Sequence, residues 1–113
     1  METTATLRRK LDNANDKIFY WFCEYESELE WYEIRKRGVT LKDKFGADNV
    51  ADKAEKSGIE IYEDDFDAPA GRKKVTRKAI ARLRFLEKKI AEWEAKASLI
   101  EDALDAWSEL NAE

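Results

Sequence analysis

The side chains in this chain that are best suited to bind a ligand are the Lys and Arg residues on either side of its Gly-containing middle segment. Residues 72–89 hold nine basic residues and a single Glu, and three more basic residues stand just before Gly38. Basic side chains bind phosphate groups, so such clusters are typical of a nucleic-acid interface. The net charge of −4 opposes this interpretation, which we keep as the alternative. Its candidate residues are Arg35, Lys36, Arg37, Arg72, Lys73, Lys74, Arg77 and Lys78.

Other side chains that could act chemically are few. The chain has no His, which excludes His-based acid–base catalysis, His metal ligands and zinc fingers. The single Cys, Cys23, excludes a disulfide framework, and we expect it to act as a small apolar side chain. The acidic run Glu60–Asp67 lacks the spacing and central Gly of an EF-hand loop, and no nucleotide-binding fingerprint is present. We therefore expect no metal, no cofactor and no enzyme activity.

Three short basic segments stand at intervals in the first third of the chain: Leu7-Arg8-Arg9-Lys10-Leu11, Lys17-Ile18 and Arg35-Lys36. Together they resemble the first helix of the all-helical chorismate mutases. The resemblance implies that Arg8 and Lys36 bind a dicarboxylate substrate and stabilise its pericyclic transition state. Tyr25 stands where that family has another Arg, and nothing after Gly38 matches. A helical enzyme of this kind is therefore a remote alternative.

The elements that must position these residues follow from the distribution of Gly and Pro. All four Gly and the single Pro lie between Gly38 and Gly71, and the flanking segments are rich in good helix formers. We predict one all-α domain over residues 1–113, with a first helix at about 4–37, a connector at 38–71 and a last helix at about 72–111. The connector is predicted to contain a short helix at about 48–57 and an acidic loop.

Both long segments carry apolar residues at alternating spacings of four and three, which is the seam of a coiled coil. In an antiparallel register Leu7 meets Leu104 and Ala14 meets Ala97, so the two seams predict a long helical hairpin. The seam of the last helix consists of Ala79, Leu83, Leu86, Ile90, Trp93, Ala97, Ile100, Leu104 and Trp107. The seam of the first helix consists of Leu7, Leu11, Ala14, Ile18, Trp21, Tyr25 and Tyr32.

Each predicted helix also carries a second apolar face outside its seam. Such a face, left bare in solution, promotes aggregation. Either the connector folds over the face of the first helix, or another chain covers it. The face of the last helix favours another chain, because the connector can hardly reach that end, and we expect a homodimer that forms a helical bundle. The candidate binding residues are Phe19, Tyr20, Cys23, Trp31, Ile34, Leu99, Ala103, Ala106 and Leu110.

The sequence also bears on where the protein works. The longest uncharged run, Ile18–Cys23, is far shorter than the roughly 20 apolar residues that cross a bilayer, and no apolar signal segment stands at the start. We therefore expect a cytoplasmic protein without enzyme activity that binds an unidentified protein partner. An adaptor, inhibitor or assembly factor of a phage or a bacterium suits this size.

Overall fold

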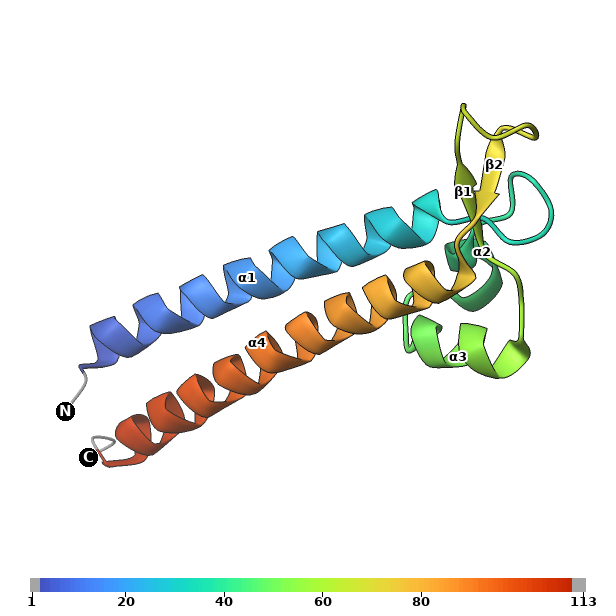
Figure 1. Cartoon of the computed structure of the whole chain (residues 1–113). Helices are drawn as coiled ribbons and strands as arrows, with labels where there is room; N and C mark the ends of the chain where they lie inside the picture. The colour runs from blue at the N-terminus through green and yellow to red at the C-terminus, as the bar shows by residue number, and fades with distance from the viewer. Residues whose placement is uncertain (1–2, 111–113) are drawn as a thin grey trace. The chain divides into compact units, whose positions relative to one another are not determined.

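The computed structural model describes residues 3–110. They form, in chain order, α1 (Thr4–Trp31), α2 (Leu41–Phe45), α3 (Val50–Ser57), β1 (Tyr62–Asp64), β2 (Arg72–Lys74) and α4 (Thr76–Leu110) (Figure 1). The chain divides into two compact units. Unit 1 is Met1–Phe22 with Lys88–Glu113, and unit 2 is Cys23–Glu87. Residue 111, where the last helix was predicted to end, lies outside the described residues.

Unit 1 contains the first part of α1 and the last part of α4, which lie side by side and run antiparallel (Figure 1). Leu7, Ala14 and Ala97 are buried between the two helices. The larger seam residues, such as Trp93 and Ile100, are half-buried, because two helices alone cannot enclose a large side chain. This arrangement confirms the predicted helical hairpin.

Unit 2 contains the end of α1, the whole connector and the start of α4. Its core is built from seam residues of both long helices and from apolar residues of the connector. The buried side chains are Tyr25, Leu29, Tyr32, Leu41, Val50, Ala51, Ala54, Ile61, Val75, Ala79, Leu83 and Leu86. The connector therefore completes the core of unit 2 with residues from both of its helices.

The first helix ends at Trp31, so the prediction that it continues to Arg37 was wrong. From Glu33 onward, backbone N–H groups no longer bond to the preceding helical turn. Glu33 N donates to Tyr62 O at 2.9 Å, Tyr62 N donates to Glu33 O at 2.8 Å, and Ile34 N donates to Val39 O at 2.9 Å. Gly38 closes the turn with a φ of 88°, a conformation that favours Gly. The long-range bonds between Glu33 and Tyr62, together with the local turn from Ile34 to Val39, outweigh the helix propensity of Ile34–Arg37.

The connector holds two helices, whereas the sequence predicted one. The additional helix, α2, begins at a capping box in which Asp43 N donates to Thr40 Oγ1 and Thr40 N donates to Asp43 Oδ2. The predicted short helix corresponds to α3, which begins at Val50 and ends before Gly58 in the left-handed conformation.

A short antiparallel hairpin links the connector to α4. Its strands pair Tyr62 with Lys74 and Asp64 with Arg72. Consequently α4 begins at Thr76 instead of the predicted position near residue 72. Ile61 explains the shift, because its carbonyl accepts from Val75 N and its own N–H donates to Thr76 Oγ1. Residues 72–74 therefore extend the hairpin before the helix starts.

Candidate functional site

The candidate binding residues of unit 1 are exposed in the single chain. Phe19 is 70% exposed, Leu99 is 69% exposed and Leu110 is 82% exposed. Tyr20 is about half exposed, and Ala103 and Ala106 are exposed as well. Burying an exposed apolar side chain of this size contributes about 1.5–3 kcal/mol. A partner that covers these faces would therefore be bound favourably.

The candidate binding residues of unit 2 differ from one another. Cys23 and Trp31 are exposed, and Trp31 Nε1 donates to Glu63 Oε2 at 3.3 Å. Ile34 is half-buried and lies beyond the end of α1, so it does not belong to a face of that helix. The helices of the connector pack on the seam residues of unit 2 and leave Cys23 and Trp31 open.

The basic residues of unit 2 are partly neutralised by acidic neighbours. Arg37 lies 3.8 Å from Asp64, Lys74 lies 3.2 Å from Glu60, and Lys78 lies 3.7 Å from Glu63. These pairs are at the surface, where each contributes little to stability. They nevertheless place a carboxylate beside each of three cations that the sequence assigned to phosphate.

Arg72 has a structural role. Its Nη2 donates to Ile34 O at 2.7 Å and its Nη1 donates to Arg35 O at 3.3 Å. The guanidinium also lies over the Tyr62 ring, 4.8 Å from the centroid. Arg72 therefore holds the turn after α1 against the hairpin, and its charge is engaged within the chain.

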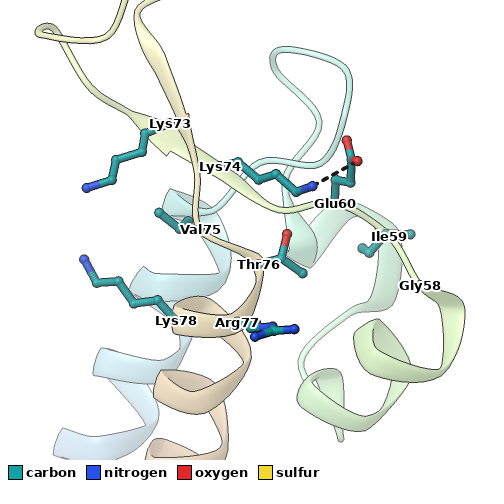
Figure 2. Close-up of a pocket in the computed structure, with 9 residues that line it drawn as sticks. All are labelled: Gly58, Ile59, Glu60, Lys73, Lys74, Val75, Thr76, Arg77 and Lys78. Atoms are coloured by element: carbon teal, nitrogen blue, oxygen red, sulfur yellow. Dashed lines mark hydrogen bonds and ion pairs between the residues drawn. The ribbon is translucent and has the colours of Figure 1, made fainter.

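A hollow of about 630 Å³ lies where β2 meets α4 (Figure 2). Figure 2 shows Lys73 and Lys78 on one side of this junction, and Lys74 on the other side with Glu60. Hydrogen bonds from Tyr62 and then Lys74 lower the pKa of Glu60, which keeps its carboxylate charged. Lys74 therefore does not converge with Lys73 and Lys78 on one phosphate position, and Glu60 already neutralises part of its charge.

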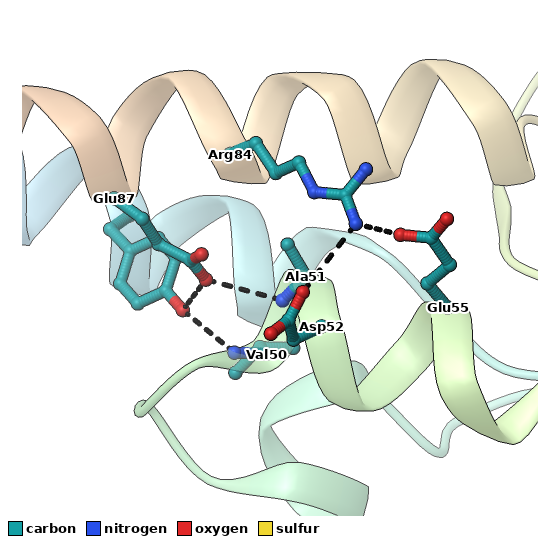
Figure 3. Close-up of polar contacts among 7 residues, drawn as sticks. Val50, Ala51, Asp52, Glu55, Arg84 and Glu87 are labelled. Atoms are coloured by element: carbon teal, nitrogen blue, oxygen red, sulfur yellow. Dashed lines mark hydrogen bonds and ion pairs between the residues drawn. The ribbon is translucent and has the colours of Figure 1, made fainter.

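A partly buried polar cluster joins α1, α3 and α4, and sequence reasoning missed it (Figure 3). Tyr25 OH donates to Glu87 Oε2 at 2.5 Å and accepts from Val50 N at 3.3 Å. Ala51 N donates to the same Glu87 oxygen at 3.2 Å. Asn49 precedes α3 without a capping side chain, so Tyr25 and Glu87 satisfy the N–H groups at the start of this helix.

Ion pairs strengthen the same contact between α3 and α4. Arg84 pairs with Asp52 at 3.5 Å and also with Glu55, both on α3 (Figure 3). Arg84 thus adds a second, solvent-exposed polar link beside the half-buried one at Glu87. Together they fix α3 on α4 and so define the surface of unit 2 around residues 54–60.

Two buried tyrosines predict how stability responds to alkaline pH. Burial, assisted by Glu28, raises the pKa of Tyr32 from 10.0 to about 12, and burial with the Glu87 hydrogen bond raises that of Tyr25 further. The folded state then holds these protons more tightly than the unfolded state. Stability should be intact below pH 10 and should fall above it, by at most about 1.4 kcal/mol per pH unit for each tyrosine.

The measurement is urea unfolding followed by circular dichroism at several alkaline pH values, with phenolate absorbance recorded in parallel. Tyr32→Phe should flatten the pH dependence, because one of the late-ionising groups is removed. A free energy of unfolding that stays constant well above pH 10 would contradict the assignment.

The structure also locates the residues that the chorismate mutase resemblance singled out. Arg8 is exposed on α1 in unit 1, and Lys36 is exposed in unit 2. Lys36 lies in the turn beyond Trp31, so it is not part of the helix that the resemblance requires. Tyr25 is engaged with Glu87.

Among residues 3–110, no group of three or more Cys, Asp or Glu residues is placed to hold a metal ion. No helix there combines the length and the apolar character needed to span a bilayer.

The geometry therefore offers two kinds of surface: exposed apolar side chains on the long helices and a partly neutralised basic region in unit 2. No protein family, no curated protein and no solved structure gives a significant match to this chain.

Proposed function

We propose that this chain is a helical protein–protein interaction module without enzyme activity. It binds through the exposed apolar side chains of α1 and α4, and it forms a homodimer through the same kind of surface. An adaptor, inhibitor or assembly factor in the cytoplasm of a bacterium, or encoded by a phage, is the setting that we propose for it. The observation that carries the proposal is the exposure of Leu99 and Leu110 on one face of α4.

The α4 face has the geometry of a docking stripe. Leu99, Ala103, Ala106 and Leu110 follow one another at spacings of four, three and four, so they line one side of the helix. The two Ala residues at the centre let a second helix approach closely, and the two Leu residues at the ends supply apolar area. Isolated exposed apolar residues are ordinary, but a continuous stripe is typical of an interaction surface.

The exposed face of α1 adds aromatic side chains to the proposed surface. Phe19 and Tyr20 are open in unit 1, and Trp31 is half exposed in unit 2. Tyr and Trp are the residue types that most often dominate binding energy at protein interfaces, because they bury a large area with little conformational entropy.

Leu99→Glu tests the proposal directly. A charge within the stripe should weaken self-association by about tenfold or more, because an unpaired carboxylate would be desolvated at the interface. The measurement is sedimentation equilibrium over a range of chain concentrations, with helicity checked by circular dichroism.

Ser108→Glu is the matched control for this substitution. It adds the same charge to α4 in unit 1 at an exposed position outside the stripe, so association should be unchanged. A dimer of equal strength in both variants, or a wild-type chain that is monomeric at every concentration, would refute the proposed dimer surface.

Nucleic-acid binding is less well supported by the geometry. Arg37, Lys74 and Lys78 have carboxylates beside them, and Arg72 binds backbone carbonyls. Binding of this kind would weaken steeply with salt, since phosphate contacts release counterions. An oligonucleotide titration at low salt is its test, and the absence of binding there would remove this alternative.

A further inference from the structure

The loop between β1 and β2 presents one aromatic side chain to solvent. Phe66 is 99% exposed, more than any other large apolar side chain that the structure describes. The loop is held by its own hydrogen bonds: Asp65 N to Gly71 O at 3.0 Å, Gly71 N to Ala68 O at 2.9 Å and Asp67 N to Asp65 Oδ1 at 3.0 Å. Phe66 is thus presented from an ordered turn, which lowers the entropy lost on docking.

Acidic residues surround this aromatic side chain. Asp65 precedes Phe66 and Asp67 follows it, and no basic residue lies between Glu63 and Gly71. A partner for the loop must therefore combine an apolar recess for the ring with cations at its rim, because like charges across an interface are repelled.

A groove with these properties lies elsewhere on unit 2. It runs between the end of α3 and the first turns of α4, and its volume is about 380 Å³. Its apolar floor is formed by Ala54, Ile59, Ile80 and Ala81. Arg77 and Arg84 stand at its edge, one near each end of this stretch of α4.

The two arginines of the groove differ in their ion pairs. Arg84 pairs with Asp52 and Glu55 on α3. Arg77 is exposed and has no hydrogen-bond or ion-pair partner among residues 3–110. The groove also continues past Gly58, Ile59 and Arg77 into the hollow at β2, where Lys74 lies (Figure 2). Glu55 also lines the groove, and Glu60 pairs with Lys74. Arg77 is therefore the cation of this groove that is left to meet a carboxylate of a partner.

We propose that the Phe66 loop of one copy docks into this groove of a second copy, with the ring on the Ile59–Ile80 floor and Asp67 beside Arg77. Charge complementarity selects a second copy, since one chain carries both the acidic loop and an apolar groove edged by Arg77. The loop does not fill the groove of its own chain, because Phe66 is almost fully exposed there. Two copies that exchange loops would form two identical contacts around a twofold axis.

This contact uses none of the residues assigned to the helix faces, so it can be tested separately from the proposed function. The chain with Phe66→Ala, labelled with ¹⁵N, reports on the groove and cannot donate its own aromatic side chain. Unlabelled wild-type chain added to it should shift the amide signals of Ile59, Ile80 and Ala81. Unlabelled Phe66→Ala chain should bind the groove at least about tenfold more weakly, because the central aromatic anchor is missing.

The two mixtures also separate this contact from association through the helix faces. Contact at the helix faces would shift signals near Phe19 and Leu99 with either unlabelled chain. Groove shifts that are absent with wild type, or equal with both unlabelled chains, would overturn the loop-in-groove contact. Phe66→Ala should not disturb folding, since the ring contacts almost nothing in the single chain.

Exchanging the charges of Arg77 and Asp67 gives a second test of the contact. Labelled Arg77→Glu chain should lose groove shifts with wild-type loops, because its rim repels Asp67. Unlabelled Asp67→Lys chain should restore those shifts, since a basic loop then meets an acidic rim. Failure of the exchanged pair to bind more tightly than Arg77→Glu with wild type would contradict the proposed pairing.

Discussion

Leu83→Ala should lower the free energy of unfolding by about 2–5 kcal/mol, because it opens a cavity in the core of unit 2. Leu83 is 0% exposed and lies in the seam of α4. The same substitution at Leu99, also on α4 but exposed, should change stability by less than about 0.5 kcal/mol in the monomer. The measurement is urea unfolding of both variants, followed by circular dichroism at low chain concentration.

The stability losses of the two variants should depend differently on chain concentration. If the chain dimerises through the stripe, Leu99→Ala should become more destabilising as concentration rises, since association stabilises the folded state. Leu83→Ala should cost the same at every concentration. Equal losses for both variants in dilute solution would contradict the assignment of Leu83 to the core and Leu99 to the surface.

The difference between these two leucines could be predicted from the sequence. The seam at spacings of four and three identified Leu83 as a core residue, because a helix places such positions on one side. Leu99 falls outside that seam, and its exposure agrees with the prediction of a second face. The periodicity of each helix thus carried enough information for the pairing of the two helices.

The end of α1 could not be predicted in the same way. Ile34–Arg37 are acceptable helix residues, and the first strong break in the sequence is Gly38. The helix stops earlier because Glu33 bonds to Tyr62 and because Arg72 binds the carbonyls of Ile34 and Arg35. These partners are far away in sequence, and local propensity does not include them. The error also placed Ile34 on a helix face to which it does not belong.

The candidate site, too, depends on contacts between residues that are far apart in the sequence. Composition identified the basic residues, but which of them are neutralised depends on the hairpin that brings Glu60 and Glu63 to Lys74 and Lys78. No role was predicted from the sequence for Phe66 in the acidic loop. An aromatic residue between acids in a turn could nevertheless have indicated a binding residue. The groove proposed to receive it is formed by α3 and α4 together, and no single segment of sequence reveals such a recess.

Glu87→Leu should be among the most destabilising substitutions of a partly exposed residue in this chain. It removes the acceptor of Tyr25 OH and of Ala51 N, and unsatisfied buried groups cost about 1–3 kcal/mol each. Because α3 has no capping side chain of its own, the start of this helix should loosen first. Urea unfolding gives the free energy, and amide hydrogen exchange at Val50 and Ala51 reports the local effect.

Tyr25→Phe and the double variant complete a cycle that isolates the Tyr25–Glu87 interaction. If the hydrogen bond is formed as described, the two losses should not add, and the coupling should be about 0.5–3 kcal/mol. Glu94→Leu is the control, since it removes an exposed carboxylate from the same helix and should change stability little. Because Glu87 helps to raise the pKa of Tyr25, Glu87→Leu should also let this phenol ionise at lower pH than in the wild type. Additive losses together with unchanged exchange at Ala51 would show that α3 is held on α4 by apolar packing and by Arg84, without the Glu87 carboxylate.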